Sequence, residues 1–208
     1  MLRRFMILLA VFASITATHA NAEPARYKFD KEHTSITFFV NHLGYSNMAG
    51  RFNDYDGYFI FDQESPLDSK VEVTVKPASV DTVSKELDKH LQGEKWFNTA
   101  KFPEIKFRST QVKVTGDKDA ELTGWLTLLG VEKAITMKVK FNKAGEFAMD
   151  KSRYIAGFSA DTTINRSQFG MNEGVPFVSE DVRIHIEVEG IREENMVISE
   201  PAETKPAN

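Results

Sequence analysis

The segment Val182-Arg183-Ile184-His185-Ile186-Glu187-Val188 places an apolar residue at every second position. Side chains of a β-strand alternate between its two faces, so this segment predicts a strand with one apolar and one polar face. On this pattern His185 faces solvent. The same alternation recurs in the stretches 36–40, 59–61, 71–75, 105–107, 112–114, 126–128 and 137–141. Many half-buried strands in one small protein must surround a common interior.

Working outward from these stretches, we expect strands near residues 26–43, 48–62, 69–76, 104–115, 120–129, 133–143, 152–165 and 181–191. The first should kink at 30–33 and the second should bend at 53–54, and turns are expected at 116–119 and 142–145. A short helical insert is expected near 84–97, because Leu87 and Leu91 have helical spacing and Ser84 is a suitable N-cap. Since closure removes exposed strand edges, the pattern predicts an all-β fold, an eight-stranded antiparallel barrel.

The two ends of the chain differ from the rest. Arg3 and Arg4 precede the uncharged apolar run 6–15, and residues 16–22 end in Ala20-Asn21-Ala22. This order predicts a secretory signal peptide over 1–22, with cleavage before Glu23. Residues 23–191 then form one domain, and the charged, proline-containing segment 192–208 is expected to be a disordered tail.

The net charge and the absence of cysteine limit which classes of binding partner and which cellular compartments fit this protein. Without Arg3 and Arg4, the 26 basic residues fall to 24 against 30 acidic residues, a net charge of −6. A mildly acidic surface argues against nucleic acid and anionic membranes as main partners. The chain has no cysteine, so an exported protein would fold without disulfides, thiolate metal sites or a lipid-anchored N-terminus. We therefore expect a periplasmic location.

An ordered set of short motifs runs through the mature chain. Their positions are 30–36, 38–44, 50–52, 57–62, 88–91, 96–97, 102–107, 124–131 and 164–171. Over residues 27–191 this set resembles the YceI-like family of periplasmic polyisoprenoid-binding proteins. The resemblance implies a lipocalin-like barrel whose long apolar cavity holds one lipid: a polyprenyl chain, a quinone tail or a fatty amide. It implies no catalysis and no cofactor besides this lipid, and either a monomer or a homodimer.

Aromatic residues are the main candidates for the cavity wall. Of the 16 phenylalanines, 14 remain after the signal peptide, many on the apolar face of their strands. The residues alone also allow a filled core, since small barrels are often packed solid; the resemblance favours a hollow one. The residues expected to contact the lipid are Ile36, Phe38, Val40, His42, Phe52, Phe59, Phe61, Phe107, Leu126, Leu128, Phe158, Ile164, Arg166, Phe169 and Met171.

Two of these residues are polar, and each has two interpretations. Arg166 shares the inward parity of its strand, so it could hold a phosphate or carbonyl at the cavity mouth. Alternatively, it clamps a loop through a carboxylate such as Glu173 or Asp181. His42 could bind a polar head group, or it could be a buried histidine with its hydrogen bonds satisfied.

The remaining histidines do not predict a metal site. His33 and His42 are nine residues apart, so in one unbroken strand they face opposite sides. Asp88 and His90 diverge by about 200° around a helix axis, which favours capping or packing over acid–base chemistry. We therefore expect neither a metal ligand set nor a catalytic residue.

Three functions remain open on the sequence. The first is a periplasmic lipid carrier, with transient contact to a membrane or membrane protein. The second is a lipid-modifying enzyme, which needs an acid–base pair facing the cavity. The third is an interaction module with a filled core, serving a stress response or a redox partner, whose surface would include Phe39, Tyr45 and Tyr55.

Overall fold

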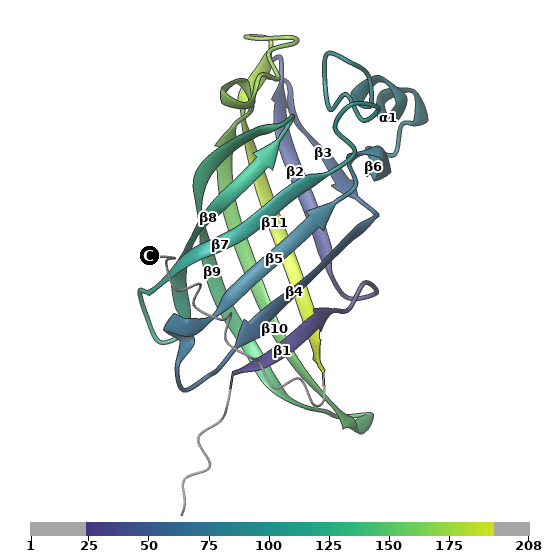
Figure 1. The fold of residues 1–208 in the computed structure, drawn as a ribbon. Helices are drawn as coiled ribbons and strands as arrows, with labels where there is room; N and C mark the ends of the chain where they lie inside the picture. Colours follow the sequence, from purple (N-terminus) through teal and green to yellow (C-terminus); the bar gives the residue numbers. More distant parts are fainter. Residues whose placement is uncertain (1–23, 194–208) are drawn as a thin grey trace, which may run out of the picture.

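The computed structural model describes residues 24–193 of the 208-residue chain. The predicted signal peptide, and residues 194–208 of the predicted tail, lie outside the described residues. The predicted start of the tail at residue 192 is wrong, because Arg192 belongs to the last strand and pairs with Tyr27. Eleven strands form one antiparallel sheet (Figure 1). They are β1 (Ala25–Phe29), β2 (Ser35–His42), β3 (Ser46–Phe52), β4 (Tyr55–Phe61), β5 (Lys70–Val75), β6 (Val80–Asp81), β7 (Ile105–Val114), β8 (Asp119–Leu128), β9 (Val131–Phe147), β10 (Asp150–Asn165) and β11 (Val178–Arg192).

The sheet closes into a barrel. Strands β1, β4, β5, β7, β8, β9, β10 and β11 follow one another as neighbours, and β11 pairs back onto β1 with Phe29 opposite Gly190. The earlier part of β11 pairs with β2, where Ile186 lies opposite Ile36. Strands β1 and β2 therefore act as two halves of one long strand along β11. This arrangement confirms the predicted eight-stranded antiparallel barrel.

At the breaks in the long strands, acceptors outside the strand ladder bond the free backbone N–H groups. Between β1 and β2, the Glu32 N–H donates to Asp30 Oδ1 over 3.1 Å. Between β3 and β4, the Asp54 N–H donates to Ser79 Oγ over 2.8 Å and the Asn53 N–H to the Ser79 carbonyl over 3.2 Å. These side-chain and loop acceptors replace the missing strand partners, so the chain bends without leaving the sheet.

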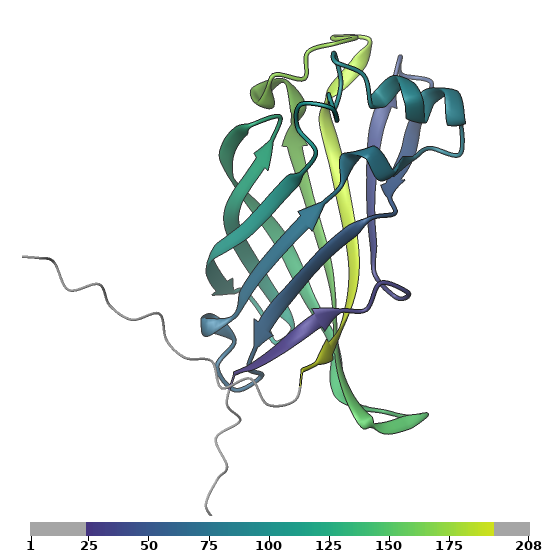
Figure 2. The same ribbon diagram turned by 45° about the vertical axis from the view of Figure 1, so that its right-hand side comes forward.

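The turn predicted at 142–145 is wrong. Those residues lie within β9, with Gly145 opposite Ile155 and Ala144 opposite Ala156 on β10. The β9–β10 hairpin extends beyond the barrel (Figure 2) and turns after Phe147. Ladder pairing satisfies the backbone of this segment, and that outweighs the turn preference of its asparagine and glycine.

Helix α1 (Lys85–Leu91) forms at the predicted insert and is shorter than expected. The Ser84 side chain accepts a hydrogen bond from the Leu87 N–H, as predicted for its N-cap. Short 3-10 turns occupy Pro66–Asp68, Pro77–Ser79 and Arg166–Phe169. Helix α1 lies at one end of the barrel, together with the β2–β3 turn and the loop before β11 (Figures 1 and 2). Within residues 24–193, no helix is long and apolar enough to cross a membrane.

Candidate ligand-binding cavity

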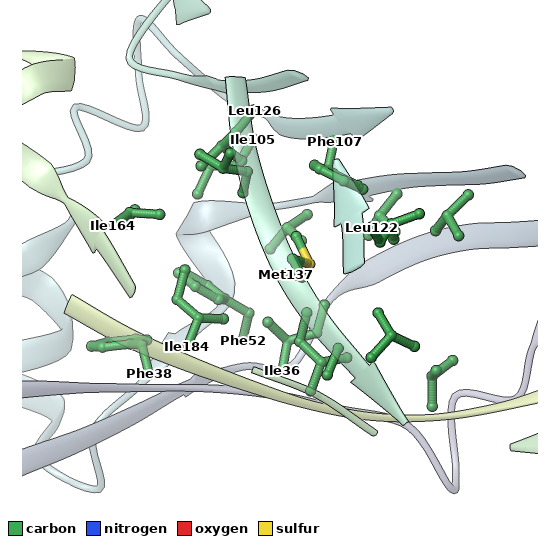
Figure 3. Close-up of a pocket in the computed structure, with 18 of the residues that line it drawn as sticks. Ile36, Phe38, Phe52, Ile105, Phe107, Leu122, Leu126, Met137, Ile164 and Ile184 are labelled. Atoms are coloured by element: carbon green, nitrogen blue, oxygen red, sulfur yellow. The ribbon is translucent and has the colours of Figure 1, made fainter. Parts of the chain in front are cut away.

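A cavity of about 560 Å³ runs through the barrel. At the α1 end its wall includes His42, Leu87 and Trp96, and at the other end it includes Pro66 and Lys118. Side chains from facing strands point into it (Figure 3). Its volume falls within the roughly 300–1,000 Å³ typical of small-molecule sites in proteins. The cavity therefore extends over the length of the barrel.

The inward side chains show that this interior is hollow. Ile184, Ile186 and Val188 lie on the inner face of β11, yet each is only half-buried. In a filled core such residues would be enclosed by neighbours on all sides. Their remaining accessible surface faces the cavity instead. The structure therefore decides between the two interpretations of the apolar alternation, in favour of the hollow barrel.

Fourteen of the fifteen predicted contact residues line the cavity. They are Ile36, Phe38, Val40, His42, Phe52, Phe59, Phe61, Phe107, Leu126, Leu128, Phe158, Ile164, Arg166 and Met171. The fifteenth, Phe169, is outside the lining and is buried in a packed cluster that includes Ile164. The strand ends at Asn165 and the chain enters a 3-10 turn, so period-two parity no longer places Phe169.

Aromatic rings form two groups in the wall. The first, near α1, contains Phe38, Phe52 and Phe97, with the Phe52 centroid 5.5 Å from each of the other two. The second contains Phe59, Phe61, Phe141 and Phe158, where the Phe61 and Phe158 centroids are 5.0 Å apart. Such rings present large apolar surfaces at little conformational cost. They suit a hydrocarbon guest.

Arg166 clamps the loop that leads into β11. The residue is 2% exposed, and its three side-chain nitrogens donate to backbone carbonyls: Nη1 to Met171 (2.7 Å), Nη2 to Val178 (2.8 Å) and Nε to Ser179 (2.8 Å). Burial lowers the pKa of Arg166 from its ordinary value. Arg166 therefore clamps a loop, as one of the two interpretations predicted. The predicted partner, a carboxylate such as Glu173 or Asp181, is wrong, because backbone carbonyl oxygens accept the hydrogen bonds instead.

The segment around α1 closes over the same end of the cavity. Asp88 is buried, and its Oδ1 accepts hydrogen bonds from the Thr82 N–H (2.7 Å) and hydroxyl (2.8 Å). These bonds, the Thr82 N–H first, hold the pKa of Asp88 below its usual range. Trp96 Nε1 donates to His90 Nε2 over 2.9 Å. Asp88 and His90 therefore have the packing role that was one of their two predicted alternatives, whereas the helix caps are Ser84 and Gln92.

The remaining predicted polar contact, His42, lies at the cavity mouth. It is the last residue of β2, opposite Ser46, and its side chain lines the cavity while staying exposed. The alternative of a buried histidine is therefore wrong. An exposed imidazole at the mouth can meet a polar head group, so that role stays a prediction.

Several lining residues were absent from the predicted set. Val71, Val73, Met137 and Ile184 obey the same alternation, so the sequence pattern already contained their signal. The α1 segment is different, because helical spacing cannot show which end of the barrel it covers. From that segment the wall receives Leu87, His90, Leu91, Trp96 and Phe97.

One group of possible metal ligands lies outside the cavity. Ligand atoms of Asp30, His33 and Glu189 all lie within 4.8 Å of one another. His33 Nδ1 is 2.9 Å from Asp30 Oδ2, and Arg153 Nη2 is 3.6 Å from the same oxygen. The Asp30 hydrogen bond raises the pKa of His33. Because a guanidinium already faces the carboxylate, we interpret the group as an ion-pair cluster.

The comparisons with known proteins agree with this geometry. A family model described as YceI-like domain matches residues 27–190. A UPF0312 protein of Pectobacterium atrosepticum is 42% identical over 195 residues, covering 93% of this chain and 100% of the relative. Protein YceI of an Escherichia coli strain is 41% identical over 189 residues, covering 90% and 97%.

Solved structures show the same barrel. The Campylobacter jejuni YceI protein has 31% identity and a TM-score of 0.68, covering 74% of this chain and 91% of that chain. A polyisoprenoid binding domain from Saccharophagus degradans has 12% identity and a TM-score of 0.62, covering 82% and 100%, and shows likeness of fold. Together with the match over residues 27–190, these relatives establish that the chain belongs to the YceI-like family.

Proposed function

We propose that this protein is a periplasmic carrier that holds one long-chain isoprenoid-type lipid inside its barrel. The observation that carries this proposal is the apolar cavity running from the α1 end to the opposite end. The Saccharophagus degradans domain, which has the same fold, is described as polyisoprenoid binding. A hollow barrel with a continuous apolar wall is what a long hydrocarbon chain requires.

The energetics favour a long chain over a small ligand. Burying hydrocarbon contributes about 0.8 kcal/mol per methylene. Twenty buried carbons would then contribute roughly 16 kcal/mol, against a cost of association of roughly 4–15 kcal/mol. A short ligand would not offset that cost through apolar contact alone. A chain that fills the cavity can be bound tightly.

Binding fits the polar groups of the wall better than catalysis does. The enzyme alternative needs an acid–base pair facing the cavity. Arg166 instead bonds three backbone carbonyls, and His90 accepts the Trp96 indole N–H. At the α1 end of the cavity, His42 is left as the candidate to meet a head group. A His42→Phe variant of a carrier should keep its lipid, whereas an enzyme using His42 would lose turnover.

Extraction of the native protein tests the proposal. The full chain, with its leader, is expressed in a Gram-negative host, purified from the periplasmic fraction, extracted with organic solvent and examined by mass spectrometry. We expect a long-chain isoprenoid or quinone-type species at up to one per protein. Added prenyl lipid should raise the melting temperature of the delipidated protein. Repeated preparations without any long-chain species, together with no thermal shift, would overturn the proposal.

A further inference from the structure

Exposed apolar side chains gather at the α1 end of the barrel. Tyr45 is 88% exposed and Leu43 48%, both in the β2–β3 turn, and Phe177, in the loop before β11, is 67% exposed. The two segments touch, because the Leu43 N–H donates to the Phe177 carbonyl over 2.8 Å. We call Leu43, Tyr45 and Phe177 the rim patch. Large apolar side chains held together in solvent mark interaction surfaces.

The rim patch continues the cavity wall. His42, directly before Leu43, and Met48, opposite Val40 on the facing strand, both line the cavity and are both exposed. The β2–β3 turn therefore joins two strands that carry the wall to the mouth. A lipid leaving the cavity at this end would pass the patch directly.

Backbone strain accompanies the exposed residues. Leu43 has a φ of 55°, and Val83, also at the α1 end and 93% exposed, has a φ of 69°. The left-handed region disfavours residues with a Cβ, most of all β-branched ones such as valine. Asparagine or glycine would adopt these angles more readily and would also suit the exposed position. Strain of this kind concentrates at functional sites.

The charges around the rim patch indicate which kind of membrane surface the patch can meet. Leu43 and Phe177 share a shallow surface pocket with Glu180 and Asp181. Two carboxylates next to the patch oppose an anionic surface. The nearby lysine Lys95 lies 3.3 Å from Glu173. Next to these carboxylates, apolar contact rather than attraction to anionic lipid would supply the affinity.

We propose that the rim patch docks this protein onto a bilayer of zwitterionic lipids, so that cargo passes directly between bilayer and cavity. Leu43 and Phe177 enter the boundary between head groups and acyl chains, and Tyr45 lies at head-group level, where amphipathic aromatic rings are favoured. This inference rests on the proposed lipid-carrier function. It adds the surface through which the carrier meets its membrane.

Vesicle flotation tests the docking surface. Lipid-loaded protein is mixed with phosphatidylcholine–phosphatidylethanolamine vesicles, and the bound fraction is measured for the wild type and two variants. The rim variant combines Leu43→Asn, Tyr45→Ser and Phe177→Ser, with asparagine chosen because it tolerates the left-handed backbone. The control variant combines Leu67→Ser and Met149→Ser, which remove exposed apolar side chains from the β4–β5 and β9–β10 turns. Both turns lie at the end of the barrel opposite α1 (Figure 1).

We expect the rim variant to bind vesicles at least about tenfold more weakly than the wild type, and the control variant to bind as the wild type does. High salt, or added phosphatidylglycerol, should not strengthen binding. Three results would overturn the docking surface: no vesicle binding by the wild type, equal loss in both variants, or binding that requires anionic lipid. If the wild-type protein does not bind vesicles, a protein partner is the alternative occupant of the rim patch.

Lipid extraction from the same samples separates this inference from the carrier function. If the wild type contains lipid but does not bind vesicles, the docking surface fails while the carrier function stands. If the wild type contains no lipid in repeated preparations, the carrier function itself fails. Circular dichroism and melting of both variants show that their barrels are folded.

Discussion

The ring of Phe59 lies against the backbone of Gly190, where an added Cβ would come within 2.5 Å of two ring carbons. Gly190 is also the residue of β11 that pairs with Phe29 of β1 at the closure of the barrel. The seam therefore depends on a position without a side chain. Phe59 can line the cavity only because residue 190 leaves space for its ring.

Gly190→Ala should destabilise the protein by about 1–3 kcal/mol, because the new methyl group overpacks the seam. The measurement is urea denaturation, with the midpoint falling and the slope unchanged. Gly157→Ala is the matched control. A Cβ there meets its nearest atom at 3.7 Å, so the substitution should be neutral or slightly stabilising. Equal stability of the two variants would contradict the conclusion that the β1–β11 seam leaves no space for a side chain at residue 190.

Arg166→Met should destabilise the protein by about 3 kcal/mol or more, since three buried carbonyl oxygens lose their donors. The control is Arg51→Met. Arg51 is largely exposed and pairs with Asp81, so its loss should cost less than about 1 kcal/mol. Chemical denaturation of both variants compares them directly. If Arg166→Met matched Arg51→Met, the loop clamp would not stabilise the fold.

Met137→Trp should displace lipid from the cavity. Met137 lines the cavity, and the neighbouring Lys138 on the same strand faces solvent. The larger indole ring would occupy part of the cavity volume available to the lipid, so the amount of lipid extracted per protein should fall severalfold. The control variant Lys138→Trp, which changes the outer face, should retain its lipid. Because the interior is hollow, the delipidated Met137→Trp protein should lose less than the roughly 1–3 kcal/mol expected for an overpacked core. Unchanged lipid content with a large loss of stability would instead indicate a packed interior.

The outer wall should confer a pH dependence through His185. His185 Nδ1 lies 2.9 Å from Asp161 Oδ1 and Nε2 lies 3.0 Å from Glu187 Oε1, and these contacts, Asp161 first, raise the pKa of His185 above 6.5. The protonated form is therefore favoured in the folded state. Its stabilising contribution is fully present below about pH 6.5 and is lost as the pH rises through the folded pKa.

His185→Gln tests this linkage. The stability difference between wild type and variant should be larger at pH 6 than at pH 9, measured by urea denaturation at both values. His33 has a raised pKa for the same reason, from Asp30, and is exposed. His33→Gln, made in the wild-type protein and measured in the same way, separates the contribution of His33 to the pH dependence of stability from that of His185. A difference that grows with rising pH would reverse the predicted sign.

Period-two alternation identified the strands and most of the cavity wall. It works because the two faces of a strand are determined locally, by the geometry of consecutive residues. It failed where a strand stops, at Phe169. Tyr55 was expected on the surface, yet it is buried with its hydroxyl donating to the Thr34 carbonyl. Its shared parity with Phe59 could have indicated this.

Other features depended on contacts that strand parity does not record. Arg166 meets carbonyls 5, 12 and 13 residues further along the chain, and the pairing of β10 with β11, up to Asn165 opposite Asp181, brings the loop before β11 around it. Helical spacing also carries no information about where α1 lies, and the structure places its side chains Leu87, His90 and Leu91 in the cavity wall. The outward rim patch joins two turns that are far apart in sequence.

The sequence by itself determined an antiparallel β-barrel of the YceI-like family and the parity of the side chains that face its interior. Only the tertiary structure decided that this interior is hollow. The strand pattern states which side chains point inward, whereas the space between them depends on how strand number, tilt and side-chain volume combine across the whole barrel. Phe107 of β7 and Ile184 of β11 line the same cavity although their strands are four places apart in the sheet order, and no local pattern records this.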